Sequence, residues 1–252
     1  MAGRDEIIAF CDELLESESF ADYGPNGLQV PGSREVVRVA TGVSASRELL
    51  ERAVAARAQL ALVHHGLFWD GAPRSLSDPL AARLRVALEA QLSLAAYHLP
   101  LDAHPELGNN ALLCRELGFE PERRFAEVKG RPIGMIGRSP EALSAEELAA
   151  RVTAALGREP LHFDEGPDRI RSLGVVTGAG SGSIHEAIDL GLDAFLTGEP
   201  AEPAMADSRE GGIHYLAAGH YATEIGGVRR LGELLGDRFG VEVEFVELPN
   251  PI

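Results

Sequence analysis

Cysteine and long apolar runs are both scarce in this sequence of 252 residues. Its two cysteines, Cys11 and Cys114, lie far apart and have no CxxC partner, which excludes a disulfide framework and a thiolate zinc site. No run of about 18 apolar residues is present, and the N-terminus lacks the pattern of a signal peptide. We therefore expect a soluble, cytoplasmic protein that has no membrane contact and keeps both thiols buried and free.

Positive charge is also scarce relative to negative charge. The 23 lysines and arginines are outnumbered by 39 aspartates and glutamates, which gives a formal net charge of −16. Proteins that bind nucleic acid non-specifically, or that adhere to anionic membranes, need basic residues against phosphate. The composition therefore argues against both classes, although it is compatible with a local basic pocket.

What the sequence does contain is an alternation of apolar strands with amphipathic helices. With 45% hydrophobic and 25% charged residues, it has the composition of a globular protein large enough for one large domain or two intimate ones. The first half is predicted to hold strands at residues 36–43, 60–63 and 92–97 and helices at 5–16, 47–58, 79–90 and 111–117. This pattern predicts an α/β fold with mixed, largely parallel sheets covered by helices.

A polar stretch at residues 121–130 is expected to separate two intimately packed α/β lobes, residues 1–125 and 126–252. Strands and helices alternate again in the second lobe, at residues 131–137, 144–156, 160–164, 172–177, 183–190, 193–197 and 213–217. A helix over residues 218–240 then returns His220 and Glu224 to a site shared with the first lobe. The last strand, 241–245, has a period of two and is predicted to close a sheet edge.

Two adjacent histidines end the predicted strand 60–63. His64 and His65 follow directly on apolar residues typical of a buried parallel strand, and Gly66 comes next. Neighbouring strand residues normally point to opposite faces, so both imidazoles can serve one site only if the strand ends there. We expect Gly66 to permit the turn that makes this possible.

Further ligand-type residues follow two other predicted strands. Asp102 lies in the loop after strand 92–97, and His220 and Glu224 follow strand 213–217. The last two are four residues apart, so on a helix they share a face, a spacing that suits a common metal. Alone, this spacing indicates no more than a solvated pair. In parallel sheets, however, ligands collect beyond the carboxyl ends of strands.

Together these residues offer three imidazoles and two carboxylates. Five ligands exceed what one tetrahedral zinc ion needs, whereas two cations that share a carboxylate would use all of them. We therefore predict two divalent cations, bridged by Asp102, Glu224 or both. A ligand set without thiolate suits zinc, iron, manganese, nickel or cobalt and disfavours copper(I) and iron–sulfur clusters. Since two cations roughly 3.5–4 Å apart lower the pKa of a bound water toward ~7, hydrolysis is the expected reaction class.

Five stretches of the sequence carry a shared pattern. They are LVHHGLFW (residues 62–69), YHLPLDAHP (97–105) with Gly108-Asn109-Asn110, AGHYATE (218–224), NGLQV (26–30) and TGE (197–199). These stretches closely resemble the GTP cyclohydrolase I type 2 homologues, also called the Nif-three-like dinuclear metal centre proteins, and the resemblance spans nearly the whole chain. Carried over position by position, it implies metal ligands at His64, His65, Asp102, His220 and Glu224, and none is missing here.

The resemblance also implies an assembly and a function. The implied subunit is a two-lobed α/β protein in a toroidal homohexamer, with the dinuclear sites facing an internal cavity. This sequence is the short form, because it lacks the inserted middle domain of some relatives. The implied activity is metal-dependent hydrolysis of a nucleotide-like or phosphorylated small molecule, as in a GTP cyclohydrolase. The alternative is a non-catalytic metal-binding or metal-handling oligomer that docks a partner.

His98 is the candidate catalytic residue. It lies shortly before the ligand-bearing loop, where it could transfer protons beside the metals or serve a structural role. Both interpretations stay open, as they do for His104. The remaining histidines, His162, His185 and His214, are interpreted as structural or surface residues.

Two other motifs have a functional and a structural interpretation. The glycine-rich stretch Gly178–Ser183 could cradle a phosphate at a helix N-terminus, but it matches no phosphate-binding motif, which favours a tight turn. Phe68 and Trp69 could stack a base, although packing is the expected role. Glu199, at the end of a predicted strand, is placed near the cavity by the family pattern.

Overall fold

The structure is a computed structural model that describes residues 1–252, and the chain forms two units within it. Unit 1 comprises Met1–Leu101 and Gly227–Leu248, and unit 2 comprises Asp102–Gly226 and Pro249–Ile252. The chain passes between the units at three places, inside helix α4 (Leu99–Ala103), inside helix α10 (Ile225–Phe239) and between Leu248 and Pro249. Each unit has its own central sheet and its own apolar core.

Unit 1 is built around a five-stranded sheet in the order β13-β4-β5-β6-β2. Strands β13, β4, β5 and β6 are parallel, and only β2 runs antiparallel to its neighbour. The elements of unit 1 besides α4 and α10 are β1 (Ala2–Gly3), α1 (Arg4–Leu15), a 3₁₀ turn (Ser17–Ser19), β2 (Gly27–Val30), β3 (Glu35–Val36), β4 (Arg38–Ser44), α2 (Arg47–Ala55), β5 (Leu60–His65), α3 (Asp78–Glu89), β6 (Ser93–Ala96) and β13 (Glu242–Phe245).

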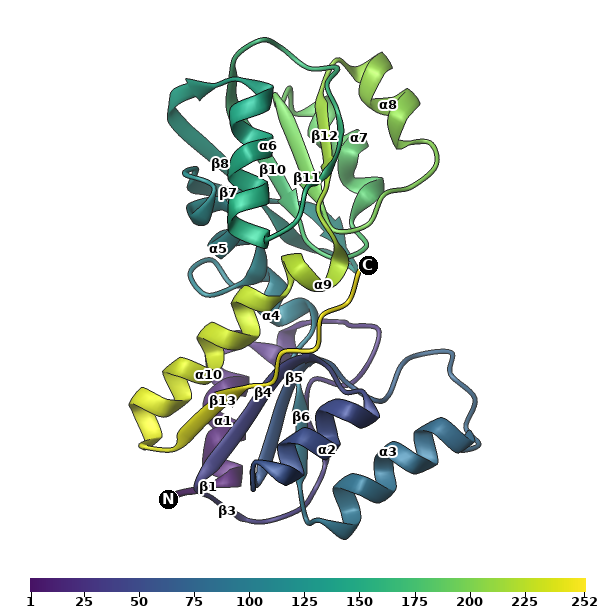
Figure 1. Cartoon of the computed structure of the whole chain (residues 1–252), viewed down its shortest axis with the longest axis vertical. Coiled ribbons are helices and arrows are strands. Elements are labelled where there is room, and N and C mark those ends of the chain that lie inside the picture. Colours follow the sequence, from purple (N-terminus) through teal and green to yellow (C-terminus); the bar gives the residue numbers. More distant parts are fainter. The chain divides into compact units, whose positions relative to one another are not determined.

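Helices cover both faces of this sheet, α2 and α3 on one and α1 and α10 on the other (Figure 1). Side chains alternate between the two faces along a strand, so every second residue of β5 faces the same helices. Ala61 and Val63 share a buried core with Leu49 and Leu50 of α2. The near-continuous burial of β5 is therefore the result of helices on both sides, as its unbroken apolar run predicts.

Helix α2 begins at a serine cap. Ser46 Oγ accepts a hydrogen bond of 3.1 Å from the backbone N–H of Leu49. We expect Ser46→Ala to lower the free energy of unfolding by about 1 kcal/mol, because a backbone donor of the first turn loses its partner. Urea denaturation measures the change. Ser46→Asp, which restores an acceptor, should recover most of it, and an unchanged stability of the alanine variant would be inconsistent with this cap.

Unit 2 has a six-stranded mixed sheet in the order β7-β8-β10-β11-β12-β9. The strands β10, β11 and β12 are parallel, whereas β7, β8 and β9 are antiparallel to their neighbours. The elements of unit 2 are α5 (Asn109–Glu116), β7 (Glu120–Val128), β8 (Arg131–Leu143), α6 (Ala145–Leu156), β9 (Leu161–Phe163), β10 (Ile170–Val176), a 3₁₀ turn (Ser181–Ser183), α7 (Ile184–Asp189), β11 (Ala194–Thr197), α8 (Ala204–Gly211), β12 (His214–Ala217) and α9 (His220–Thr223).

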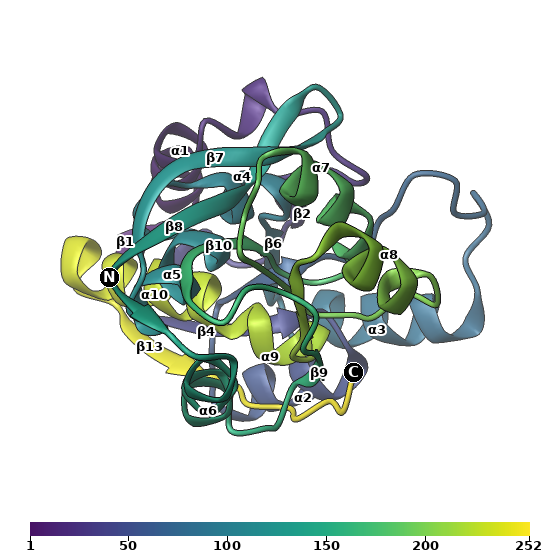
Figure 2. The ribbon, with the colours of Figure 1, turned by 90° about the horizontal axis from the view of Figure 1, so that it is seen from above.

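The sheet of unit 2 is also covered on both faces. Helices α5 and α6 lie on one side and α7 and α8 on the other (Figure 2). On the α5 and α6 side, Cys114 and Leu148 share a buried core with Leu173 and Leu216 of the sheet. The α/β fold with mixed, largely parallel sheets that the sequence predicts is therefore confirmed.

Both cysteines are buried and free, as predicted. Burial raises the pKa of the Cys11 thiol and of the Cys114 thiol to about 12. Neither sulfur is therefore ionised near neutral pH. A separate feature of the whole chain is that none of its helices combines the length and the apolar composition that a membrane span requires.

The polar stretch at residues 121–130 is not a connection between lobes, and this prediction is wrong. Residues Glu120–Val128 form strand β7, which pairs with β8 over almost its whole length. The stretch is polar because β7 is an edge strand whose outer face is exposed, while Phe125 is buried in unit 2. The predicted lobe boundary at residue 125 falls inside this strand.

Two predictions near the ligand residues also need correction. The loop expected around Asp102 contains the short helix α4, in which Pro100 occupies an early position that tolerates a missing N–H. The helix expected from residue 218 to 240 is interrupted at Glu224, which has φ −112° and ψ 5° between α9 and α10. Gly226 and Gly227 follow after Ile225, and glycine is a weak helix former.

Candidate metal centre

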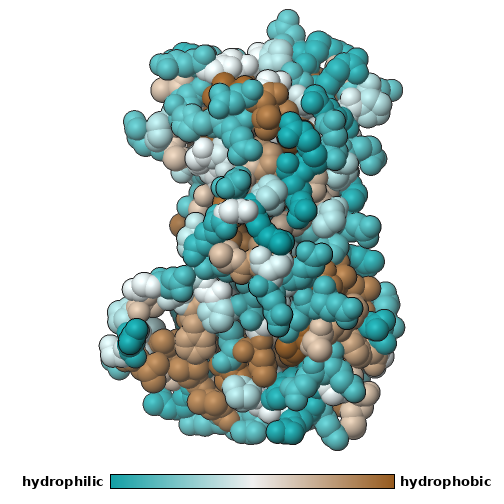
Figure 3. Space-filling view, turned by 180° about the vertical axis from the view of Figure 1, so that it is seen from behind, coloured by the Kyte–Doolittle hydropathy of each residue, from teal (hydrophilic) through white to brown (hydrophobic).

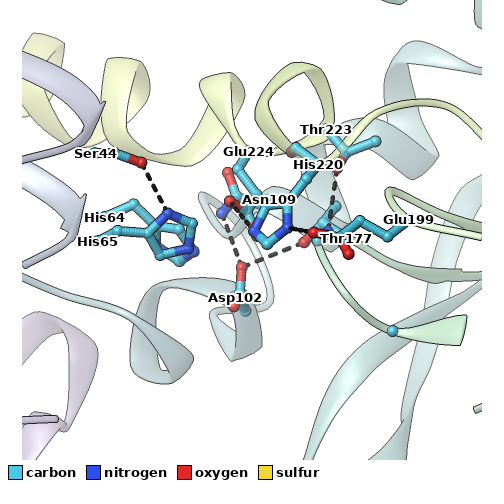
Figure 4. A network of polar contacts seen from close by, with 12 residues as sticks. Ser44, His64, His65, Asp102, Asn109, Thr177, Glu199, His220, Thr223 and Glu224 are labelled. Atoms are coloured by element: carbon cyan, nitrogen blue, oxygen red, sulfur yellow. Dashed lines mark hydrogen bonds and ion pairs between the residues drawn. The ribbon is translucent and has the colours of Figure 1, made fainter. Parts of the chain in front are cut away.

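His64 and His65 are the last two residues of β5, so the strand includes them. Their ring centroids nevertheless lie 4.6 Å apart. His64 Nδ1 is 2.9 Å from the carbonyl oxygen of Tyr97, which can only accept, so Nδ1 carries the proton and Nε2 of the neutral ring carries the lone pair. His65 Nδ1 lies 3.1 Å from Ser44 Oγ (Figure 4). The two imidazoles therefore lie side by side at the end of β5.

Gly66 has a different role from the predicted one. Its φ is not positive, so no special turn requires glycine there. A Cβ at this position would instead lie 2.2 Å from Nε2 of Gln29. The amide of Gln29 donates to the carbonyl of Pro25 and accepts from the N–H of Leu67, each at 2.8 Å. Glycine is needed because the Gln29 side chain crosses the backbone directly after His65.

His98 brings a third imidazole to this part of unit 1. Its ring centroid lies 5.1 Å from that of His64 and 5.5 Å from that of His65, and one nitrogen of each ring lies within 4.8 Å of the others. The indole of Trp69 meets the His98 ring edge-on at 5.2 Å. The structure therefore places the candidate catalytic histidine beside the histidine pair.

Asp22 orients the ring of His98, a contact that the sequence does not predict. Its side chain is 2% exposed, and Oδ1 lies 2.7 Å from His98 Nδ1. Oδ2 accepts from the Asn26 amide and from the N–H of Leu99, both at 2.9 Å. Burial is the largest single influence and raises the pKa of Asp22, but the hydrogen bond and charge of His98, together with the hydrogen bonds from Asn26 and Tyr23, lower this pKa below its usual value. In the sequence Asp22 lies in a turn-rich segment that carries no signal of this contact.

We expect Asp22→Asn to lower the free energy of unfolding at pH 7 by roughly 1–3 kcal/mol. Both carboxylate oxygens of Asp22 accept hydrogen bonds, whereas an amide has only one oxygen that can accept. The pKa of Asp22 is lower in the folded than in the unfolded chain, so its contribution is present above the unfolded pKa of about 4 and is lost as the pH falls through the folded pKa. The stability difference should therefore shrink in acid.

Urea unfolding at pH 7 and at about pH 3 checks this dependence. Asp237→Asn, which removes an exposed aspartate of α10, is the matched control and should change stability little at either pH. A difference between wild type and Asp22→Asn that stays constant across this range would rule out the lowered pKa as its origin.

Asp102 is held in place within unit 2. It is 5% exposed, and its Oδ1 accepts hydrogen bonds from the Asn109 amide at 2.8 Å and from Thr177 Oγ1 at 3.3 Å (Figure 4). The Asn110 amide donates to the backbone carbonyl of Asp102 at 3.2 Å and accepts from the N–H of Thr177 at 2.8 Å. Since Thr177 directly follows β10, the end of this strand fixes the carboxylate. One carboxylate oxygen of Asp102 lies within 4.8 Å of one carboxylate oxygen of Glu224.

His220 lies between two carboxylates of unit 2 (Figure 4). Its Nε2 is 3.1 Å from Glu224 Oε2, and its Nδ1 is 2.5 Å from Glu199 Oε1. Burial alone would lower the pKa of His220, but Glu224 and Glu199 raise it to about 9, so the metal-free ring is protonated at neutral pH. The predicted pairing of His220 with Glu224 is present although the helix is interrupted, and Glu199 contacts the histidine directly.

The glycine-rich turn 178–183 uses its backbone groups internally. The N–H of Gly178 donates to Thr223 Oγ1 at 3.2 Å, and the N–H of Gly180 donates to Thr197 Oγ1 at 3.1 Å. The turn then enters a 3₁₀ segment and the six-residue helix α7. These contacts favour the tight turn over a phosphate cradle.

His104, Phe68 and Trp69, the remaining candidates, differ in what their side chains contact. His104 Nδ1 accepts from the backbone N–H groups of Glu106 and Leu107, both at 3.2 Å, which gives this histidine a structural role. Phe68 packs against the core of unit 1, as expected. Trp69, however, is 37% exposed, so packing alone does not account for it.

The donor atoms fit divalent cations. Imidazoles and carboxylates are the ligands of first-row divalent metals, and an imidazole that ligates usually donates its other N–H to a carbonyl or carboxylate. The carbonyl behind His64 and the carboxylate behind His220 meet this requirement. Unit 1 thus brings together His64, His65 and His98, and unit 2 brings together Asp102, His220 and Glu224.

Comparisons with known proteins agree on one family. The model of the Duf34/NIF3 (NGG1p interacting factor 3) family matches residues 2–251. A protein of Pseudomonas aeruginosa named GTP cyclohydrolase 1 type 2 homolog is 45% identical over 245 residues, which cover 97% of either chain. A protein of Vibrio cholerae with the same name is 42% identical, with 98% of either chain covered.

Solved structures give the same result. The protein ybgI, described as being of unknown function, is 40% identical, and the two folds superpose with a TM-score of 0.95 over all of both chains. The protein TTHA1606 from Thermus thermophilus is 34% identical, with a TM-score of 0.90 and full coverage of both chains. These similarities extend over both units.

Proposed function

Because this chain belongs to the Duf34/NIF3 (NGG1p interacting factor 3) family, we propose that it is a metal-dependent hydrolase with a dinuclear metal centre. The proposed ligands of the two cations are His64, His65, Asp102, His220 and Glu224. The proposed substrate is a nucleotide-like or otherwise phosphorylated small molecule, in keeping with the name of the relatives, GTP cyclohydrolase 1 type 2 homolog.

The observation that carries the proposal is the hydrogen bonding behind the imidazoles. Tyr97 and Glu199 engage Nδ1 of His64 and of His220, so Nε2 would be the ligating atom of both rings. The path of the chain also supports the proposed ligand set. Of the three places where the chain passes between the units, one lies in α4, which carries Asp102, and another lies in α10, which begins directly after Glu224.

When bound, two divalent cations, whether zinc, iron, manganese, nickel or cobalt, would supply Lewis acidity and lower the pKa of a water molecule. His98 would then transfer a proton at Nε2, because Asp22 engages its Nδ1. Trp69 offers an exposed aromatic surface beside His98, on which a planar base could stack. Neutralisation of His220 must accompany metal binding, since its metal-free ring is protonated.

Turnover by the metal-loaded protein tests the proposal. The protein would be reconstituted with each of the five metals and incubated with GTP, with formate release as the readout, and then with a metabolite extract. We expect metal-dependent consumption of a phosphorylated compound, and His98→Asn should lower turnover while metal content is unchanged. A protein that holds two cations and consumes nothing would overturn the hydrolase and favour a metal-handling protein.

We further propose that the chain assembles as a toroidal homohexamer, as its family resemblance implies. Large apolar side chains, among them Val37 and Leu88, are exposed, and apolar patches interrupt the hydrophilic surface in Figure 3. Such patches support contact with other copies of the chain. Light scattering should give the mass of six 26.9 kDa chains, and a monomer at micromolar concentration would refute the assembly.

A further inference from the structure

Three residues of unit 2 that the proposed centre does not use form a second cluster of ligand-type side chains. They are His162 of β9, Asp164 just beyond it, and His214 of β12. Because β9 and β12 pair antiparallel with His162 opposite Leu216, all three side chains belong to the same face of the sheet. One ligand atom of each lies within 4.8 Å of the other two.

The protonation of His214 is set by its hydrogen bond. Its Nε2 lies 2.9 Å from the carbonyl oxygen of Pro167, which can only accept, so Nε2 carries a proton. In the neutral ring Nδ1 then carries a lone pair. This atom is buried and makes no hydrogen bond, although it lies 3.1 Å from Asp164 Oδ1. Two electron pairs therefore face each other, an arrangement that a cation between them would stabilise.

His162 adds a second imidazole to the same place. Its ring centroid lies 5.7 Å from that of His214, and its Nε2 is buried without a hydrogen bond. The side chain of Asp164, by contrast, is 69% exposed, which leaves the cluster open to ions from solution.

We infer that His162, Asp164 and His214 form a further metal site, which takes one zinc ion per chain. Two imidazoles and one carboxylate, with a fourth position open to water, match the coordination that zinc adopts with three protein ligands. The Pro167 carbonyl behind His214 is the hydrogen-bond acceptor that orients a ligating imidazole. Bound zinc would fasten the edge strand β9 to β12. The inference does not depend on the proposed dinuclear centre.

Equilibrium dialysis against buffered zinc tests this site. Asp164→Asn and His162→Asn should each hold one zinc ion per chain fewer than wild type, because each variant removes one of three ligands. Asp164 is exposed, so its substitution leaves the fold intact, as circular dichroism would verify. His185→Asn is the matched control, since His185 is an exposed histidine 3.7 Å from Asp207 on the same unit. It should bind as much zinc as wild type.

Crystals soaked in zinc give a second readout. Anomalous scattering at the zinc edge should show a peak bounded by the three side chains in wild type and none there in Asp164→Asn. The variants should bind one zinc ion fewer than wild type whether or not the dinuclear centre also binds zinc. The outcome therefore tests this site independently of the proposed function. Folded Asp164→Asn and His162→Asn proteins that bind as much zinc as wild type, with no peak at the cluster, would overturn the inference.

Discussion

Glu224→Gln is expected to remove at least one bound cation per chain and to weaken metal binding by at least about 100-fold. Glu224 is 3% exposed and contacts Nε2 of His220, and its carboxylate lies within 4.8 Å of that of Asp102. A neutral amide keeps the shape of the side chain, but it supplies no negative charge and only one oxygen. The substitution therefore tests the ligand role with little change in packing.

Elemental analysis and isothermal titration calorimetry measure the loss. Glu233→Gln makes the same chemical change at an exposed position of α10, where the carboxylate pairs with Arg230, and serves as the control. It should retain the metal content of wild type. If Glu224→Gln kept two cations at wild-type affinity, Glu224 would not be a ligand.

Gly178→Ala is expected to displace the Glu224 carboxylate, because the added methyl group would overlap it. Gly178 has φ +65°, and a Cβ there would lie 2.2 Å from Glu224 Oε1 and 3.1 Å from His220 Nε2. The left-handed backbone alone costs roughly 1–2 kcal/mol for alanine. Because Glu224 must also move, we expect metal affinity to fall by about 10–100-fold, the range seen when partners of metal ligands are changed.

The neighbouring Gly182→Ala is the control for this substitution. It lies in the same turn, and a Cβ there meets no atom within 4 Å. Urea unfolding and metal titration of both variants separate the backbone cost from the displacement of Glu224. A Gly178→Ala protein with wild-type metal affinity would show that the Glu224 position does not control binding.

The histidine pair could be predicted because its signal is local. An unbroken apolar run identifies a parallel strand covered on both faces, and ligands gather where such strands end. In the structure His64 and His65 are the last two residues of such a strand, β5. The role of Gly66 could not be predicted, because it depends on Gln29, which is distant in sequence and crosses over it.

The surroundings of His98 show a second limit of the sequence. Asp22 lies 76 positions before its imidazole partner, and nothing in a turn-rich segment marks one aspartate as a hydrogen-bond acceptor for a distant ring. Only the folded sheet, with β2 beside β6, brings the two together. In the same way, only the fold of unit 2 brings Asp102 next to its hydrogen-bond partner Thr177, which lies 75 positions later in the sequence.

Edge strands were the least predictable part of the fold. Strand β7 has charged residues on its outer face, so its sequence is as polar as a loop, and its pairing with β8 is not visible in periodicity. The sequence predicts His162 and His214 to be structural or surface residues for a related reason. Their common face depends on the register of the edge strand β9 against β12, which a sequence alone does not give.

Anomalous scattering from crystals of the metal-loaded protein tests the central claim most directly. Data collected on both sides of the absorption edge of the bound metal locate each cation and identify its element. We expect two adjacent peaks whose ligands are His64, His65, Asp102, His220 and Glu224. A single peak, or peaks with none of these five side chains within bonding distance, would contradict a dinuclear centre at this site.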